Sequence, residues 1–248
     1  MPTARSAPKK SPATTRPNGN GKDKNKKKTL AQPAPDAVSI DAAPDQSWLL
    51  IALVLLGGMS SLAVEMVAAR LMAPYFGDSQ FVWATLIGLT LIYLTIGYAL
   101  GGRLADRAPR SLALYQLTAV AAATIGLIPP LASVVLGWAA EAFGRPDSDI
   151  TAGPLIAALV LFSLPVTLLG CVSPYAIRLR VKAVGTAGST AGRLYALSTV
   201  GSILGTFVPV FWLMPHYGVR ATIFLFAGML MAISAAGMLV QRRSAQQH

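Results

Sequence analysis

The chain has 248 residues, of which 54% are hydrophobic and only 12% are charged, and its mean hydropathy is +0.55. Soluble domains contain about 25% charged residues, so this composition excludes an ordinary soluble domain and indicates a protein that crosses a membrane several times. The net charge of +11 does not indicate a nucleic-acid-binding protein, because no aromatic side chain accompanies the basic residues that precede Trp48.

The first predicted region is a disordered, basic cytoplasmic tail that covers residues 1–46. It contains nine Lys or Arg residues and four Asp residues among many Pro, Ala, Thr and Asn, and it has few apolar side chains to bury. We expect the tail to remain in the cytoplasm and to orient the first helix; binding to anionic lipid is the alternative. A cleavable signal peptide is not expected, because the first apolar run starts late and lacks a cleavage site.

Apolar runs long enough to cross about 30 Å of hydrocarbon follow the tail. We predict six helices, at residues 48–73, 81–100, 112–140, 154–177, 194–215 and 221–240. Pro129 and Pro130 lie in the third run and three further prolines in the fourth, so we expect both helices to bend, and the fourth to bend or break near its end. The predicted fold class is therefore all-α: a polytopic six-helix bundle over residues 47–243 with a short cytoplasmic end at 244–248.

The charges of the loops predict the orientation of the bundle. An even number of helices places both termini on one side, and Lys and Arg accumulate in cytoplasmic loops. With cytoplasmic termini, the inner loops and the end contain Arg103, Arg107, Arg110, Arg178, Arg180, Lys182, Arg193, Arg242 and Arg243. The outer loops have Arg145 and Arg220 as clear positive charges, beside Asp78, Glu141, Asp147 and Asp149. We predict a multi-pass protein of the plasma or inner membrane.

The second and third predicted helices are joined by the sequence GGRLADRAPR, residues 101–110. The pattern of Gly102, Leu104, Asp106, Arg107 and Arg110 resembles the signature loop between the second and third helices of the major facilitator superfamily. In that family each half is a six-helix bundle, and the loop braces helices on the cytoplasmic face. The resemblance implies a fold like one half of such a transporter, with Arg103 also in the bracing loop; a plain positive-inside loop with an ion pair is the alternative.

Three longer stretches resemble the membrane domain of fused transporter-like/spermidine synthase proteins. They are GGMSSLAVEMVAARLMAPYFGDS (57–79), LLGCVSPYAIRLRV (168–181) and GRLYALSTVGSILGTFVPVFWLMPHYGVRATI (192–223). In those proteins a cytoplasmic aminopropyltransferase-like domain with a Rossmann-type fold follows the bundle. Here eight residues follow Val240 and no glycine-rich nucleotide loop is found, so we expect no enzymatic activity from this chain and no catalytic residues.

Glu65 is the only acidic residue inside a predicted helix. A charged group at the bilayer centre costs about 2.5–3.5 kcal/mol on insertion scales, so Glu65 should face protein or water. We expect its partner to be a hydroxyl such as that of Ser61, a backbone group or a basic residue such as Arg70. The functional interpretation is a proton- or cation-responsive site; the alternative is a structural polar contact near the outer interface.

Two more groups of residues are candidates for function. The exit of the fourth helix could present backbone and cations to an anionic group, or it could be a proline-terminated span with snorkelling arginines. Its residues are Ser173, Pro174, Tyr175, Arg178 and Arg180. Small polar residues on the fifth helix indicate a stripe for close helix contact, with a substrate path as the alternative. They lie beside one aromatic residue: Tyr195, Ser198, Gly201, Ser202 and Gly205.

The leading functional hypothesis is a non-enzymatic membrane module of the spermidine-synthase-associated type. It would lie in the lipid bilayer, anchor or serve a separate, soluble aminopropyltransferase-like partner, and admit or sense a polyamine or another cationic solute. A small homo-oligomeric, half-size transporter is the alternative, and an inert scaffold a third hypothesis. The single cysteine and two distant histidines, His216 and His248, predict neither a metal site nor a cofactor.

Overall fold

A computed structural model describes residues 44–143, 152–181 and 184–246 of the chain. The chain divides into two units, Met1–Ser39 and Ile40–His248, and all described residues belong to the second. The predicted tail up to residue 43 lies outside the described residues. Within the described ranges every regular element is a helix and no strand occurs, which confirms the prediction of an all-α fold there.

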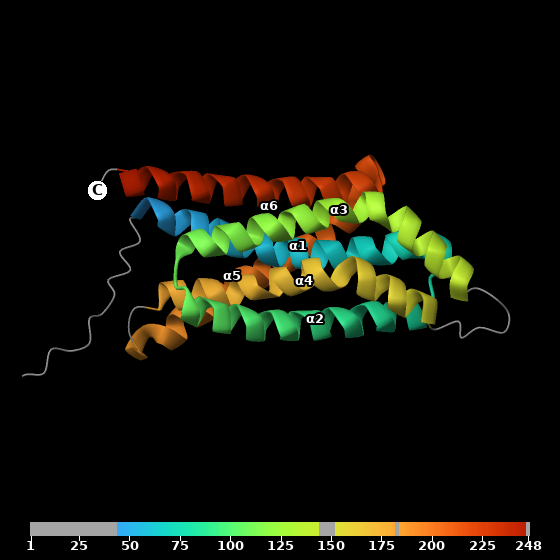
Figure 1. Cartoon of the computed structure of the whole chain (residues 1–248), viewed down its shortest axis with the longest axis horizontal. Helices are drawn as coiled ribbons and strands as arrows, with labels where there is room; N and C mark the ends of the chain where they lie inside the picture. Colours follow the sequence, from blue (N-terminus) through green and yellow to red (C-terminus); the bar gives the residue numbers. More distant parts are fainter. Residues whose placement is uncertain (1–43, 144–151, 182–183, 247–248) are drawn as a thin grey trace, which may run out of the picture. The chain divides into compact units, whose positions relative to one another are not determined.

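The second unit consists of long helices with short connections (Figure 1). In chain order they are α1 (Pro44–Phe76), α2 (Gln80–Arg107), α3 (Ser111–Phe143), α4 (Ala152–Arg180), the 3-10 turn η1 (Val184–Thr186), α5 (Ala187–Val208), the π-helical turn η2 (Pro209–Leu213) and α6 (Met214–Gln246). The first helix starts four residues earlier than predicted, at Pro44, because a proline lacks the N–H that the first turn leaves unpaired anyway. The last helix continues to Gln246, past its predicted end at residue 240.

Five helical segments of the described chain are long and apolar enough to cross a membrane. Four of them contain α1 to α4, and the fifth is a segment of 57 residues from Ala187 to Arg243. Large apolar side chains are more than half exposed on the outside of the bundle, for example Leu91, Val134 and Phe211. Soluble proteins rarely expose such surfaces in continuous patches, so lengths and surface together are those of a multi-pass membrane protein.

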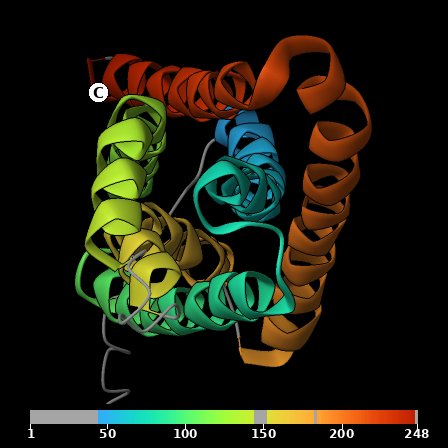
Figure 2. The ribbon, with the colours of Figure 1, turned by 90° about the vertical axis from the view of Figure 1, so that its right-hand side faces the viewer.

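The 57-residue segment does not run straight. As one straight helix it would measure roughly 85 Å, far more than the thickness of the hydrocarbon core of a bilayer. Gly218 interrupts it with φ 82° and ψ 169°, a left-handed conformation that glycine adopts without steric cost. Figure 1 shows α5 and α6 running in opposite directions along the bundle, and Figure 2 shows the sharp change of direction between them. The gap between the fifth and sixth predicted helices, residues 216–220, falls at the same place.

Helix α1 is the centre of the bundle. It is the only described helix that contacts all of α2, α3, α4, α5 and α6, and the other helices surround it in the view of Figure 2. Accordingly, 61% of its most apolar window is buried, compared with 28% for α2. The helices α5 and α6 contact α1, but within the described residues they do not contact each other. The position of α1 therefore determines how the last two helices dock.

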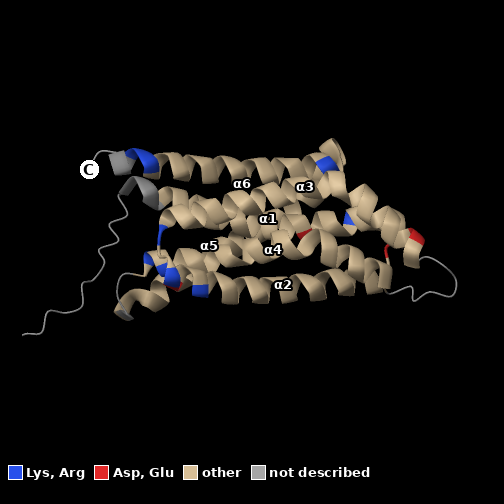
Figure 3. Cartoon of the chain, viewed as in Figure 1, with Lys and Arg blue, Asp and Glu red and all other residues tan. Residues whose placement is uncertain are grey.

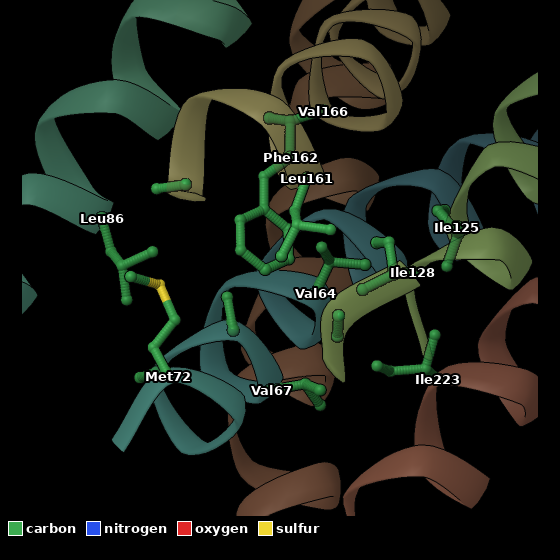
Figure 4. Packing of buried hydrophobic residues seen from close by; sticks show 14 of the residues in the cluster. Val64, Val67, Met72, Leu86, Ile125, Ile128, Leu161, Phe162, Val166 and Ile223 are labelled. Atoms are coloured by element: carbon green, nitrogen blue, oxygen red, sulfur yellow. The ribbon is translucent and has the colours of Figure 1, made fainter. Parts of the chain in front are cut away.

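Apolar side chains from α1, α2, α3, α4 and α6 fill the larger of the buried clusters (Figure 4). Met72 of α1 lies near Leu86 of α2, and Phe162 of α4 projects between the helices toward α1. A second cluster, which contains Tyr115 and Tyr175, fills the end of the bundle where α2 joins α3. Both clusters consist of side chains drawn from helices far apart in sequence, so they form only when the whole bundle is assembled.

Glycines allow the closest helix contacts. A methyl group added to Gly201 or Gly205 of α5 would overlap the carbonyl oxygen of Leu55 or Met59 of α1. The hydroxyl of Ser202, between them, donates a hydrogen bond of 3.2 Å to the carbonyl of Gly58. Helices α2 and α4 meet in the same way at other glycines. Between helices in lipid, such backbone approach and interhelical hydrogen bonds supply the stability that the hydrophobic effect cannot.

We predict that Gly205→Ala destabilises the bundle by roughly 1–3 kcal/mol, the usual cost of overpacking a close contact. The matched control is Gly228→Ala on α6, where an added methyl group meets no atom within 4 Å. Because alanine favours a helix by about 1 kcal/mol over glycine, the control should be as stable as the parent or more so. Thermal unfolding in detergent, followed by size-exclusion chromatography, measures both; equal melting temperatures for the two variants would contradict the contact.

Candidate functional site

Most arginines of the described residues lie at one end of the bundle, where α2 joins α3, α4 leads to α5 and α6 ends (Figure 3). We call it the basic end, defined by Arg103, Arg107, Arg110, Arg178, Arg180, Arg193, Arg242 and Arg243. At the opposite end the described charges are Arg70, Asp78, Glu141 and Arg220. Four charges used to predict orientation lie outside the described residues: Arg145, Asp147, Asp149 and Lys182. The bundle therefore has one strongly positive end.

An ion pair joins α2 to α4 at the basic end. Nε of Arg178 lies 2.9 Å from Oδ1 of Asp106. The two side chains are 47% and 70% exposed, so solvent screens the attraction, and pairs of this kind contribute about 0–1 kcal/mol. Their geometry nevertheless fixes which turn of α4 lies beside the end of α2. An ion pair was expected for Asp106 of the predicted loop, and its partner Arg178 lies 72 residues later in the sequence, on α4.

A buried tyrosine makes a second link in the same place. The ring of Tyr175 on α4 is completely buried, and its hydroxyl donates a hydrogen bond to the carbonyl of Ala108. The same hydroxyl lies 3.3 Å from the carbonyl of Arg110. Both carbonyls belong to the short connection between α2 and α3, around Pro109, which cannot donate a backbone bond of its own. The carbonyls of Ala108 and Arg110 also accept backbone hydrogen bonds from Arg110 and Ala113, so the Tyr175 hydroxyl adds a side-chain link that ties α4 to this connection.

The predicted loop and the predicted exit of the fourth helix are therefore one assembly. Gly102 faces open space, while the side chains of Arg103, Arg107 and Arg110 are exposed around it. We expected the fourth helix to bend or break near its end. It does not break there: α4 continues through Pro174 to Arg180 and lies against α2. The arginines of this end extend from an intact helix and from a loop that is held to it.

The hydroxyl of Ser173, on the same stretch of α4, lies 3.4 Å from that of Ser198 on α5. A methyl group added to Gly58 of α1 would overlap the backbone at Ser198. Ser198, Gly201, Ser202 and Gly205 thus all serve contacts between helices, whereas Tyr195 is exposed at 54%. Because the small polar residues of α5 make contacts between helices, the geometry favours the predicted stripe for close helix packing over a substrate path.

Glu65, Ser61 and Arg70 do not form a joint site. Glu65 is half-buried on α1, and among the described residues no ion pair connects it with Arg70. Two residues five apart in a helix point about 140° away from each other, so they cannot share a face. The Ser61 hydroxyl is buried without a hydrogen-bond partner in the described structure. The described residues also include no cluster of three or more His, Cys, Asp or Glu side chains that could hold a metal ion.

Sequence reasoning missed Gly97 of α2 and the hydrogen bonds of Tyr175 of α4, which help to hold the assembly together. A methyl group added to Gly101 would lie 2.6 Å from Cα of Cys171, and one added to Gly97 would lie 2.9 Å from Cα of Gly170. The spacing of Gly97 and Gly101 repeats the small-residue pattern that was noticed on the fifth helix, so this signal was available. The hydrogen bonds of Tyr175 had no such signal, because their acceptors are backbone atoms of a distant loop.

We predict that Tyr175→Phe destabilises the protein by roughly 0.5–1.5 kcal/mol, because it removes the hydrogen bonds that the hydroxyl of this buried tyrosine makes to the loop. Asp106→Asn should cost less, about 0–1 kcal/mol, because the ion pair that it removes is exposed. Tyr195→Phe removes an exposed hydroxyl and is the control, with an unchanged melting temperature. Thermal unfolding of the three variants gives the order; an Asp106→Asn variant less stable than Tyr175→Phe would show that the ion pair dominates.

Comparison of the chain with models of protein families, with curated proteins and with solved structures finds no match. The resemblance to the membrane domain of fused transporter-like/spermidine synthase proteins therefore stays a prediction from three stretches of sequence. The structure itself shows an all-helical bundle with membrane-spanning lengths in its described part. At its arginine-rich end, α4 is bonded to the last turn of α2 through the ion pair and to the loop that follows α2 through Tyr175.

Proposed function

We propose that this chain is a non-enzymatic membrane module that anchors or serves an aminopropyltransferase-like partner in the cytoplasm. The observation that carries the proposal is the basic end: eight arginines gathered around an ordered, braced loop. A surface that only fixes orientation needs positive charge but no defined structure. The hydrogen bond from Tyr175 to the loop and the ion pair from Arg178 to Asp106 hold α4 against the end of α2, and the arginines extend from these ordered elements, as suits recognition of another protein.

The proposed bundle crosses the membrane six times, with both termini in the cytoplasm. The bend at Gly218 divides the long last segment into α5 and α6, each of which is long enough for one crossing. The positive-inside rule then places the basic end in the cytoplasm. Trp138 and Trp212, which are more than half exposed, would lie near the outer interface, and Trp48 near the inner one, as expected for aromatic belts.

Cysteine labelling tests this orientation. In a Cys171→Ser background, the variants Gln80→Cys, Gly188→Cys and Arg243→Cys each place one thiol at an exposed position near a helix end. We expect a membrane-impermeant maleimide to label residue 80 in intact cells, and residues 188 and 243 only after permeabilisation. The background without a new cysteine is the control. Labelling of residue 243 in intact cells would mean that α5 and α6 together do not return the chain to the cytoplasm.

Charge complementarity favours a protein partner at the basic end over a free polyamine. A polyamine is a cation, and the field of eight arginines repels it, whereas an acidic protein surface is attracted. Passage or sensing of a cationic solute, if it belongs to the module, would depend on Glu65. This side chain is half-buried in the central helix and has no ion pair in the described part of the chain.

Recovery of bound proteins from native membranes tests the partner. We expect mild-detergent purification of the tagged chain, followed by mass spectrometry, to recover a protein with an aminopropyltransferase-like domain. Reversal of charge in the Arg103→Glu/Arg107→Glu variant should reduce this recovery by roughly tenfold, which corresponds to about 1.4 kcal/mol of lost attraction. The Arg103→Lys/Arg107→Lys variant keeps the charge and is the matched control. Recovery of the chain alone, as a stable homodimer, would instead favour the half-size transporter formed by two copies.

A further inference from the structure

A pocket of about 460 Å³ lies at the end of the bundle opposite the basic end. Its walls come from the last turns of α1, the middle of α3 and the start of α6. The volume falls within the range of about 300–1,000 Å³ that is typical of small-ligand sites. None of the residues that line this pocket belongs to the basic end, where the proposed partner protein would bind, so the pocket is independent of the proposed function.

Two arginines from different helices line this pocket: Arg70 of α1 and Arg220 of α6. They are the only Lys or Arg side chains that the described ranges place at this end, and both contribute to the same pocket. No acidic side chain lines it, and no ion pair involves either arginine in the described part of the chain. Asp78 borders a separate, smaller pocket with Arg70, and its carboxylate accepts a hydrogen bond of 2.8 Å from Nε1 of Trp83. Two arginines thus line one pocket that has no acidic residue among its walls.

The positions of the two arginines require an explanation. Arg70 lies six residues before the end of α1, and its side chain is exposed beside the apolar surface of a helix long enough to span a membrane. Arg220 follows the bend at Gly218, and Gly218 itself lines the pocket, so the change of helix direction brings Arg220 to its mouth. Positive charge is otherwise excluded from this end of the described chain. A pair of arginines kept at such a place indicates that an anion compensates them.

The remaining walls indicate the kind of anion. Leu71, Leu136 and Val219 provide apolar surface, and Ser133 and Tyr217 provide hydroxyl groups beside the arginines. Guanidinium groups bind phosphate with paired N–H donors, and hydroxyls complete its hydrogen bonds. Tyr217 is 62% exposed, so the pocket opens to the surroundings of the bundle at the level of one helix end. An apolar wall beside a phosphate-binding pair suits a group that carries hydrocarbon.

We propose that Arg70 and Arg220 bind the phosphate group of an anionic ligand in this pocket. The ligand is either a phospholipid of the leaflet at this end of the bundle, with its acyl chains along the exposed apolar surface of α3 and α6, or a free phosphate-bearing solute. Both sources present the same chemistry to the two guanidinium groups. The site requires the bend at Gly218 and the close approach of α6 to α1, and it requires no partner at the basic end.

Native mass spectrometry of the purified full chain tests the site with three probes: phosphatidylglycerol, phosphatidylcholine and inorganic phosphate. We expect phosphatidylglycerol to bind at least roughly tenfold more tightly than phosphatidylcholine, and the Arg70→Gln/Arg220→Gln variant to lose this preference. The Lys9→Gln/Lys10→Gln variant loses the same charge outside the pocket and the basic end and should bind like the parent. Binding of inorganic phosphate that the same substitutions remove would assign the pocket to a free solute instead of a lipid.

Equal affinity of the parent for both lipids, with no binding of phosphate, would overturn the proposal. So would an unchanged preference in the Arg70→Gln/Arg220→Gln variant. If that variant fails to fold, Arg70→Lys/Arg220→Lys replaces it, because it keeps both charges but removes the paired donors. Weaker binding of phosphatidylglycerol to this second variant supports the guanidinium pair, and unchanged binding contradicts it.

Discussion

The close contact between α1 and α5 is the interaction on which the rest of the bundle depends. Lipid tails are as apolar as the helices, so the hydrophobic effect does not hold membrane helices together. At this contact Gly201 and Gly205 let two backbones touch, and Ser202 adds a hydrogen bond to the carbonyl of Gly58. With α1 held in the centre, α2, α3, α4 and α6 all find a surface on it. Both ends of the bundle inherit their geometry from this central helix.

The two ends have different chemistry because the same helices bring different residues together there. At the basic end, Tyr175 of α4 bonds to the connection between α2 and α3, Arg178 of α4 pairs with Asp106 of α2, and the arginines nearby face solvent. At the opposite end, α1 and α6 bring two arginines to a pocket without an acid. One end therefore presents a broad positive surface, and the other a small site with a pair of donors.

Much of the fold could be predicted from the sequence, and much of the site could not. Long apolar runs predict membrane-crossing helices because helices satisfy their own backbone, whatever their neighbours are. Contacts between helices lack this independence: the expected neighbour of Glu65, Arg70, lies on another face of α1 and lines a pocket with Arg220 instead. Likewise, the sequence pattern around Asp106 indicated the loop. The pairing of Asp106 with Arg178 could not be predicted, because it depends on the position of α4. The sequence alone therefore predicts which segments form helices, whereas the contacts between side chains of different helices depend on how the helices pack.

The order of contacts along the chain has a consequence for biogenesis. The hydrogen bond between Ser202 and Gly58 joins residues 144 positions apart. At about 5–20 residues per second, the ribosome needs roughly 7–30 s to synthesise that interval. During this time the first helix enters the membrane with its glycine-lined face uncovered, and α2 to α4 have to collect around it before α5 arrives. The nascent bundle thus spends most of its synthesis with its central helix accessible to other helices of the membrane, and the arrival of α5 ends that exposure.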